Sequence, residues 1–284
     1  MINLQHSNMK ASTIALLGFG IIILLYYSAG VLVSISFDVM KQPELMLITQ
    51  GILQLIIMLG MTILIAKSSS MNFHKIFNLR QFPQLGHIAA GLIGIVGILL
   101  FQTGYDVIQE MTVPEALKPL YETLTKLIED VYAQFLLGDS LLQIILSISV
   151  IAIVPAFSEE FLFRGYLQNA FEYDFSPAKS IIITSLLFGI IHMNPIGFVS
   201  LTFIGLFLGV SAYASRTLWL PIIIHFTNNL IAYIVITQAD MLELEQSAER
   251  LDLGSALILM FSGIAIVTAA SWYMIKTKKT PDHF

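Results

Sequence analysis

The sequence predicts an all-α membrane protein with about eight transmembrane helices, forming one embedded domain over residues 1–284. Of its 284 residues, 56% are apolar and only 12% are charged, and the mean hydropathy is +0.82. Uncharged stretches long enough to cross about 30 Å of hydrocarbon recur along the chain. This composition excludes an ordinary water-soluble enzyme and a disordered chain. The formal net charge of -5 argues against a nucleic-acid partner.

Six of these stretches are clear candidates for transmembrane helices. They cover residues 11–37, 45–66, 88–105, 140–158, 218–239 and 253–275. Residues 180–215 carry no charge apart from a histidine. Because proline and glycine interrupt helices, the sequence Asn194-Pro195-Ile196-Gly197 divides this stretch into a short span and a longer one. The predicted total is eight.

An even number of spans places both termini on the same side of the membrane. The basic tail of Lys276, Lys278 and Lys279 indicates that this side is the cytoplasm. With this topology, 10 of the 14 Lys and Arg residues lie on the side of the termini, but only 5 of the 19 Asp and Glu residues do so. One missed span would invert this partition, so the partition supports the predicted number.

The loop of residues 106–139 carries an amphipathic pattern that predicts a helix on the outer membrane surface. The apolar positions at helical spacing are Leu120, Leu124, Leu127 or Ile128, Val131 and Phe135. The helix is expected to be a plain connector, or alternatively a cap or a partner-binding element. The acidic residues of the loop are expected to be solvated.

Ionisable side chains are costly inside a bilayer, so those in or beside a span usually face a protein-lined cavity. One such segment is residues 159–164, which follow the fourth span. Glu160 and Arg164 are four residues apart with the acid first, which favours an ion pair on a helix. One interpretation is a solvated pair at a helix end. Glu159 is rotated by about 100° from Glu160 and has no evident partner.

Two more polar segments lie in the fifth and seventh spans. Phe188 and His192 share a helix face because they are four residues apart, as do His225 and Asn229. Glu159 and His192 are equally far from the turn expected between spans four and five, so they should lie level with each other. His225 joins them only if this hairpin extends about 10 Å further toward the cytoplasm.

One carboxylate, two imidazoles and an amide suit hydrolysis of an acyl bond by either of two mechanisms. In the first, Glu159 is the general base for a water that His192 holds, and His225 and Asn229 donate hydrogen bonds to the oxyanion. This mechanism requires no cofactor. In the second, Glu159, His192 and His225 bind a divalent metal such as zinc, and Glu160 or another group is the base. The chain has no H-E-x-x-H motif and no cysteine, and we favour the first mechanism.

The three motifs together resemble those of a known family. EExxxR at residues 159–164, FxxxH at 188–192 and HxxxN at 225–229 occur in this order on separate spans. They are similar to the signatures of the CAAX protease and bacteriocin-processing (CPBP, or ABI) family of intramembrane endopeptidases. The resemblance covers roughly residues 140–237, which would be the catalytic core, with a cavity among helices four to seven that opens toward the cytoplasmic leaflet.

The resemblance implies proteolysis of a membrane-associated peptide or protein, with or without a lipid anchor. The catalytic residues would be Glu159, His192, His225 and Asn229, supported by Glu160, Arg164 and Phe188. Arg164 would be structural or would steer a substrate carboxylate, and its ion-pair spacing favours the structural role. Some members of the family are described as metalloproteases and others as glutamate-dependent enzymes.

The family contains several biological roles. Its eukaryotic branch cuts prenylated C-a-a-X tails after the lipidated cysteine. Its bacterial branch, which the short loops of this chain resemble, is associated with maturation of bacteriocins or signal peptides, self-immunity and regulation of sensor kinases. We therefore expect a bacterial plasma-membrane protein with both termini in the cytoplasm.

Two other classes of function compete with proteolysis. A non-catalytic member of the same fold would act as a regulator or immunity scaffold for a membrane partner, but it would be expected to lose the motif residues, and all are present. A proton-coupled transporter would also place Glu and His in spans. It predicts repeated halves and interrupted helices at matching positions, and the sequence has neither.

Overall fold

The computed structural model describes residues 9–36, 42–68, 76–133, 138, 140–238 and 251–278, and within these ranges it is helical with no strand. The helices are α1 (Ala11–Ser36), α2 (Pro43–Leu53), η2 (Gln54–Gly60), α3 (Met61–Ser68), α5 (Leu85–Thr112), η3 (Glu115–Leu117), α6 (Lys118–Ala133), α7 (Leu141–Ile148), η4 (Ser149–Ile153), α8 (Val154–Glu160), η5 (Phe161–Gln168), α9 (Asn169–Asp174), α10 (Pro177–Ile191), α11 (Phe198–Ser215), α12 (Trp219–Thr237) and α14 (Leu253–Lys276). The all-α prediction is confirmed.

Seven helical segments of the described chain are long and apolar enough to cross a membrane. Two of them are continuous through π-helical turns, namely Pro43–Ser68 and Leu141–Asp174. The eighth predicted span is the apolar helix α10, which has only 15 residues. It corresponds to the short span that the Asn194–Gly197 break predicts, and the expected number of about eight is confirmed.

The predicted end of the fourth span at residue 158 is wrong. The helix continues through Glu159, Glu160 and Arg164 to Asp174, over 34 residues. These charges do not mark a membrane boundary because they are buried and paired within the protein. The expected turn after Asp174 is confirmed: Ser176 accepts a hydrogen bond from the Lys179 amide as the N-cap of α10.

The hairpin of α10 and α11 ends inside the molecule. Met193, which follows the C-cap residue His192 of α10, takes a left-handed conformation (φ 49°) that stops the helix. The Asn194 side chain then accepts a hydrogen bond from the Gly197 amide at 2.8 Å, closing the turn into α11. The two helices pack closely, since a Cβ on Gly205 would lie 3.2 Å from the Ser185 Cα atom. This turn fixes the position of His192 at the end of α10.

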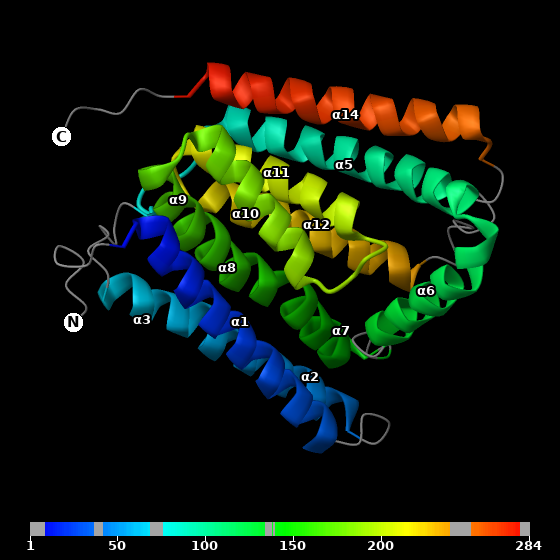
Figure 1. Cartoon of the computed structure of the whole chain (residues 1–284), viewed down its shortest axis with the longest axis horizontal. Coiled ribbons are helices and arrows are strands. Elements are labelled where there is room, and N and C mark those ends of the chain that lie inside the picture. Colours follow the sequence, from blue (N-terminus) through cyan, green and yellow to red (C-terminus); the bar gives the residue numbers. More distant parts are fainter. Residues whose placement is uncertain are drawn as a thin grey trace.

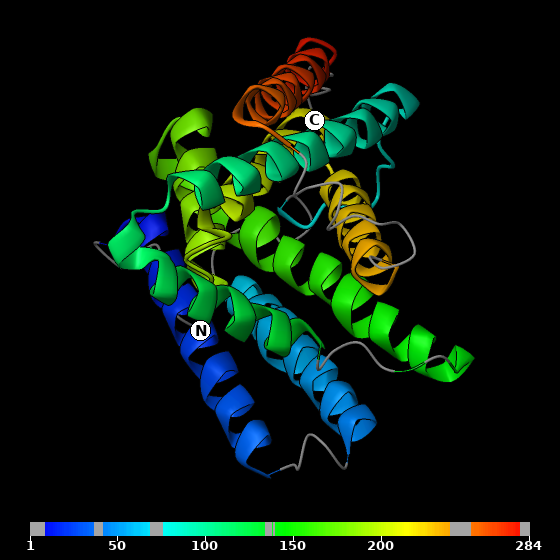
Figure 2. The same ribbon diagram turned by 90° about the vertical axis from the view of Figure 1, so that its right-hand side faces the viewer.

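The helices surround a central group that carries the motifs. In Figure 1, α8, α10, α11 and α12 lie between an outer pair, α5 and α14, and the α1–α2 hairpin. Figure 2 shows from the side that α1 and α2 lie on the face opposite α5 and α14. Small residues bring α5 and α14 together, because a Cβ on Gly97 would lie 2.9 Å from the Gly263 carbonyl oxygen. The start of α1 and the end of α14 lie at one end of the bundle, and α6 lies at the other.

The helix predicted in the loop of residues 106–139 is α6. Three of its apolar side chains, Leu120, Leu127 and Val131, are exposed on one face, which suits a membrane surface. Their contact with a bilayer stays a prediction. Phe135 and Asp139 lie outside the described residues.

Candidate active site

A buried ion pair forms the base of the site. The Arg164 Nη1 atom donates to Glu160 Oε1 at 2.9 Å, and neither side chain is exposed. The second guanidinium nitrogen donates to the Gly205 carbonyl at 3.0 Å, which ties the fourth span to α11. The Phe188 ring covers the guanidinium, with its centroid 4.7 Å away. The expected ion pair is present, but its predicted exposure to solvent is wrong, and Arg164 binds the protein itself.

His225 lies between the two neighbouring carboxylates. Its Nδ1 atom is 2.8 Å from Glu160 Oε1, and its Nε2 atom is 3.9 Å from Glu159 Oε2. Because a carboxylate only accepts, Nδ1 carries the hydrogen of this bond. Glu160 therefore orients the ring and leaves Nε2 directed toward Glu159. The question whether His225 reaches the other two motifs, which spacing alone left open, is answered by this contact.

His192 is oriented by its own helix. Its Nδ1 atom lies 2.6 Å from the Phe188 carbonyl oxygen, which accepts, so Nδ1 is again the donor and Nε2 is available. The Phe188 ring packs against both imidazoles, with centroids 4.7 Å from that of His192 and 5.8 Å from that of His225. The FxxxH motif thus supplies His192 and also the Phe188 ring, against which both histidines pack.

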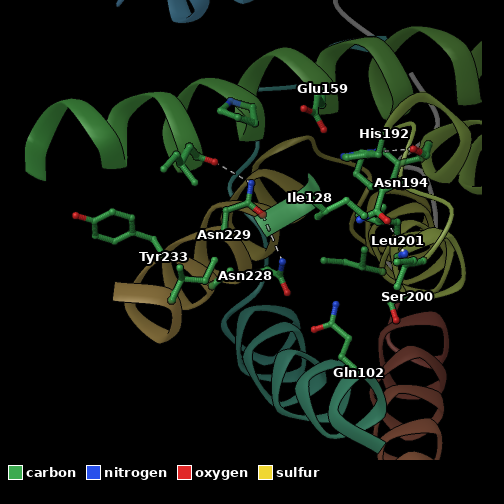
Figure 3. A pocket seen from close by; sticks show the side chains of 18 of the residues that line it. Gln102, Ile128, Glu159, His192, Asn194, Ser200, Leu201, Asn228, Asn229 and Tyr233 are labelled. Carbon is green, nitrogen blue, oxygen red and sulfur yellow. Dashed lines mark hydrogen bonds between the residues drawn. The ribbon is translucent and has the colours of Figure 1, made fainter. Parts of the chain in front are cut away.

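Glu159 has one bonded oxygen and one without a partner. Oε1 accepts a hydrogen bond from Gln54 Nε2 at 3.2 Å. Oε2 has no hydrogen-bond partner in the protein. This is unusual for a carboxylate oxygen, because the residue is buried, with only 8% of its surface exposed. Figure 3 shows the carboxylate pointing into the cavity. Sequence reasoning missed Gln54 because it considered only the segments around ionisable residues; an uncharged polar residue inside another span was the available signal.

Asn229 is positioned by an irregularity in the fourth span. Pro155 has no amide hydrogen, so the Ile151 carbonyl lacks its usual partner four residues later. Asn229 Nδ2 donates to this carbonyl at 3.2 Å. One hydrogen on Nδ2 remains for a ligand, since an amide carries two. The π-helical turns η4 and η5 flank Glu159 and Glu160, and such turns are frequent at functional sites.

These side chains line one cavity of about 700 Å³. Glu159, His192, His225 and Asn229 all contribute to its wall, so the structure brings the four predicted catalytic residues together. The cavity also has walls that the sequence did not predict, from α1, α2, η2, α5 and α6. Their polar contributions are Tyr26, Gln50, Gln54, Gln102, Asp106, Tyr121, Thr125 and Glu129.

The direction of the cavity differs from the prediction. Its lining includes α6 and residues of the turn 194–197, which lie away from the end of the bundle where α1 starts and α14 ends. This lining does not agree with a cavity open toward the end where α1 starts and α14 ends, which is the end that the predicted topology places in the cytoplasm. The acidic loop was also misread in part, because Asp106 and Glu129 line the cavity.

The donors for a metal were tested by their geometry. Within the described ranges, no group of three or more His, Asp or Glu side chains could hold a metal ion. His225 uses Nδ1 for Glu160, and its Nε2 atom lies 3.9 Å from Glu159 Oε2, a distance that two ligands of one ion span only at an angle wider than tetrahedral. The described side chains form no three-ligand group in this arrangement, and we derive no step through a metal.

The fold and the site define a class of protein: a polytopic membrane protein with a buried carboxylate, two imidazoles and an amide around one cavity. Residues 141–231 match the family model described as "Type II CAAX prenyl endopeptidase Rce1-like". This segment contains all three motifs and confirms the resemblance to the CPBP family for about a third of the chain. No curated protein and no solved structure matches the chain. The match supports an intramembrane protease of the CAAX type.

Proposed function

We propose that this protein is an intramembrane endopeptidase in which Glu159 activates a water molecule to hydrolyse a peptide bond of a membrane-associated substrate. The observation that carries the proposal is the buried, unpartnered Oε2 atom of Glu159, which faces the cavity beside His225 Nε2 at 3.9 Å. A carboxylate oxygen without a partner is available to accept a proton from water. Gln54 holds the other oxygen in place.

In the proposed reaction, His192 Nε2 holds the water and Glu159 Oε2 accepts its proton. The new hydroxide oxygen bonds to the carbonyl carbon of the substrate, and the carbonyl oxygen becomes an oxyanion. Asn229 donates its remaining amide hydrogen to this oxyanion. The C–N bond then breaks, and Glu159 returns the proton to the leaving amine. The products are an amine and a carboxylic acid, which then releases its proton to water.

The roles of Glu160, Arg164 and Phe188 are structural in this proposal. Glu160 holds the Nδ1–H of His225, Arg164 neutralises Glu160, and Phe188 supports the two rings. Arg164 is not available to steer a substrate carboxylate because it is fully buried and bonded to Glu160 and Gly205. The proposal requires no metal.

The protein is an integral membrane protein, and we further propose that its membrane is a bacterial plasma membrane with both termini in the cytoplasm. The excess of Lys and Arg over Asp and Glu on the side of the termini supports this orientation. The cavity would then extend toward the outer leaflet. The substrate would be a peptide or protein held at the membrane, with or without a lipid.

The proposal is tested by comparing membrane and secreted peptides from cells that carry the native protein with those from cells that carry Glu159→Gln at equal abundance. Glu122→Gln is the matched control, because Glu122 is exposed on α6 and does not line the cavity. We expect a precursor to accumulate, and its trimmed product to disappear, only with Glu159→Gln. Identical peptide profiles, together with full function of Glu159→Gln in its host, would instead indicate a regulator or scaffold.

A further inference from the structure

The charges that line the cavity have one sign. Three carboxylates, Asp106, Glu129 and Glu159, belong to its wall, and none of the described lining residues is a Lys or Arg. The two histidines are the only other ionisable groups there apart from tyrosines. Since a cavity of one sign with low-dielectric walls attracts ligands of the opposite charge, this arrangement favours a cationic group.

Two of these carboxylates lie on exposed positions at the mouth of the cavity. Asp106 follows Gln102 by one helical turn on α5, and both line the cavity. Glu129 lies on the face of α6 that also carries Tyr121 and Thr125. Burial raises the pKa of the Tyr121 hydroxyl, and the nearby carboxylates of Glu110 and Asp106 raise it further. Both carboxylates belong to α5, so Tyr121 on α6 faces that helix.

The three carboxylates of α6 differ in their surroundings. Glu122 and Asp130 are exposed and do not line the cavity, whereas Glu129 does. Asp130 is rotated by about 100° from Glu129 and lies on another face, whereas Glu122 lies on nearly the same face but about 10 Å nearer the start of the helix. Rotation thus separates Asp130 from the cavity, and distance along the helix separates Glu122 from it.

Further inside, the cavity wall has polar atoms without hydrogen-bond partners, which a bound peptide could use. Glu159 is 8% exposed and its Oε2 atom has no partner, and its carboxylate points into the cavity (Figure 3). Ser200, which is 6% exposed and also lines the cavity, has a hydroxyl without a partner. The amides of Gln102, Asn228 and Asn229 also line the cavity and suit a peptide backbone.

We infer that the substrate carries a lysine or arginine close to the scissile bond, and that Asp106 and Glu129 select it. This inference rests on the proposed endopeptidase function. A free C-terminal carboxylate would meet only acidic groups at the mouth, and Arg164, the nearest cation of the motifs, is bonded elsewhere. The substrate is therefore recognised as an internal segment with a positive charge, and not through its terminal carboxylate.

The test uses a set of quenched fluorescent peptides with one common farnesylated sequence. Each peptide carries a single Lys, Gln or Glu at one position, and each position on both sides of the scissile bond is tested. Each exposed carboxylate is expected to contribute about 2- to 5-fold. Hence we expect kcat/KM for the best Lys peptide to exceed that of the matched Glu peptide by about 10-fold or more, mainly through KM. The ratio should fall with added salt.

Variants assign the selection to the two carboxylates. Asp106→Asn with Glu129→Gln should bring the Lys-to-Glu ratio close to one. Asp106→Lys with Glu129→Lys should invert it, which a merely structural role would not do. The matched control is Glu122→Gln with Asp130→Asn, which changes the net charge as the first pair does but should leave the ratio unchanged.

A binding measurement tests the selection of positively charged peptides without requiring that they are cleaved. The same peptides are bound to the Glu159→Gln variant, and their dissociation constants are measured by fluorescence anisotropy. If Lys peptides bind best but the native protein cleaves none of the set, the charge selection stands and the proposed cleavage fails for these sequences. If cleavage or binding shows no preference for Lys over Glu, or if the control pair lowers the ratio as much as the cavity pair, the inference is overturned.

Discussion

Replacing Glu160 by Gln should destabilise the protein, because it leaves Arg164 as an uncompensated charge in the interior. Both side chains are fully buried, and Glu160 Oε1 accepts from both Arg164 and His225. Removing one partner of a buried ion pair costs about 3–5 kcal/mol. With an unfolding entropy of roughly 2.1 cal/mol/K per residue, this corresponds to a decrease in Tm of about 5–8 °C for a chain of this length.

The assay is thermal unfolding of the purified protein in detergent, followed by intrinsic fluorescence. Glu159→Gln is the internal comparison, since its Oε2 atom has no bond to lose and Gln keeps an acceptor for Gln54. It should change the stability by less than about 1 kcal/mol. Replacing Glu160 and Arg164 together by Met should recover most of the loss, because hydrophobic replacement of a buried pair is often neutral.

The reasoning would be refuted by two results. One is a Glu160→Gln variant with the native Tm, which would mean that Arg164 finds water or another anion. The other is a double variant that is as unstable as the sum of the two single variants, which would mean that the pair is not coupled.

Three further predictions concern the site and the topology. Asn229→Leu should lower kcat by about 10²–10³-fold with little change in KM, since an oxyanion donor is lost; an unchanged kcat in a peptide assay would contradict this role. Gln54→Leu should lower kcat/KM, because Glu159 Oε1 loses the hydrogen bond that orients the carboxylate, and an unaltered kcat/KM would remove Gln54 from the site. In intact cells, an impermeant thiol reagent should label Glu122→Cys but not Lys276→Cys, and the reverse pattern would invert the topology. The chain has no cysteine of its own.

Local sequence patterns predicted the helices and the pairs of motif residues. Hydropathy over about 20 residues reports directly on a span, and residues four apart share a face in any helix. This is why the ion pair of Glu160 and Arg164 and the contact between Phe188 and His192 could be predicted before the structure was known.

Contacts between distant segments could not be predicted in the same way. Gln54 and Glu159 are 105 residues apart in the sequence, and no local pattern connects them. The end of the fourth span was misplaced because charge usually marks the edge of a membrane, whereas here Glu160 and Arg164 neutralise each other inside the protein. The cavity was assigned to the wrong end because the packing of α6 over it depends on tertiary structure.

The most direct test of the account is cleavage of a membrane-anchored reporter peptide by the purified protein and by Glu159→Gln, with matched thermal stability. We expect the rate of the variant to fall by at least about 10²-fold, as for loss of a general base. We also expect the native rate to survive a chelator such as EDTA. A variant that keeps its rate within about threefold would contradict the role of Glu159. A native rate that EDTA abolishes and zinc restores would contradict the metal-independent mechanism.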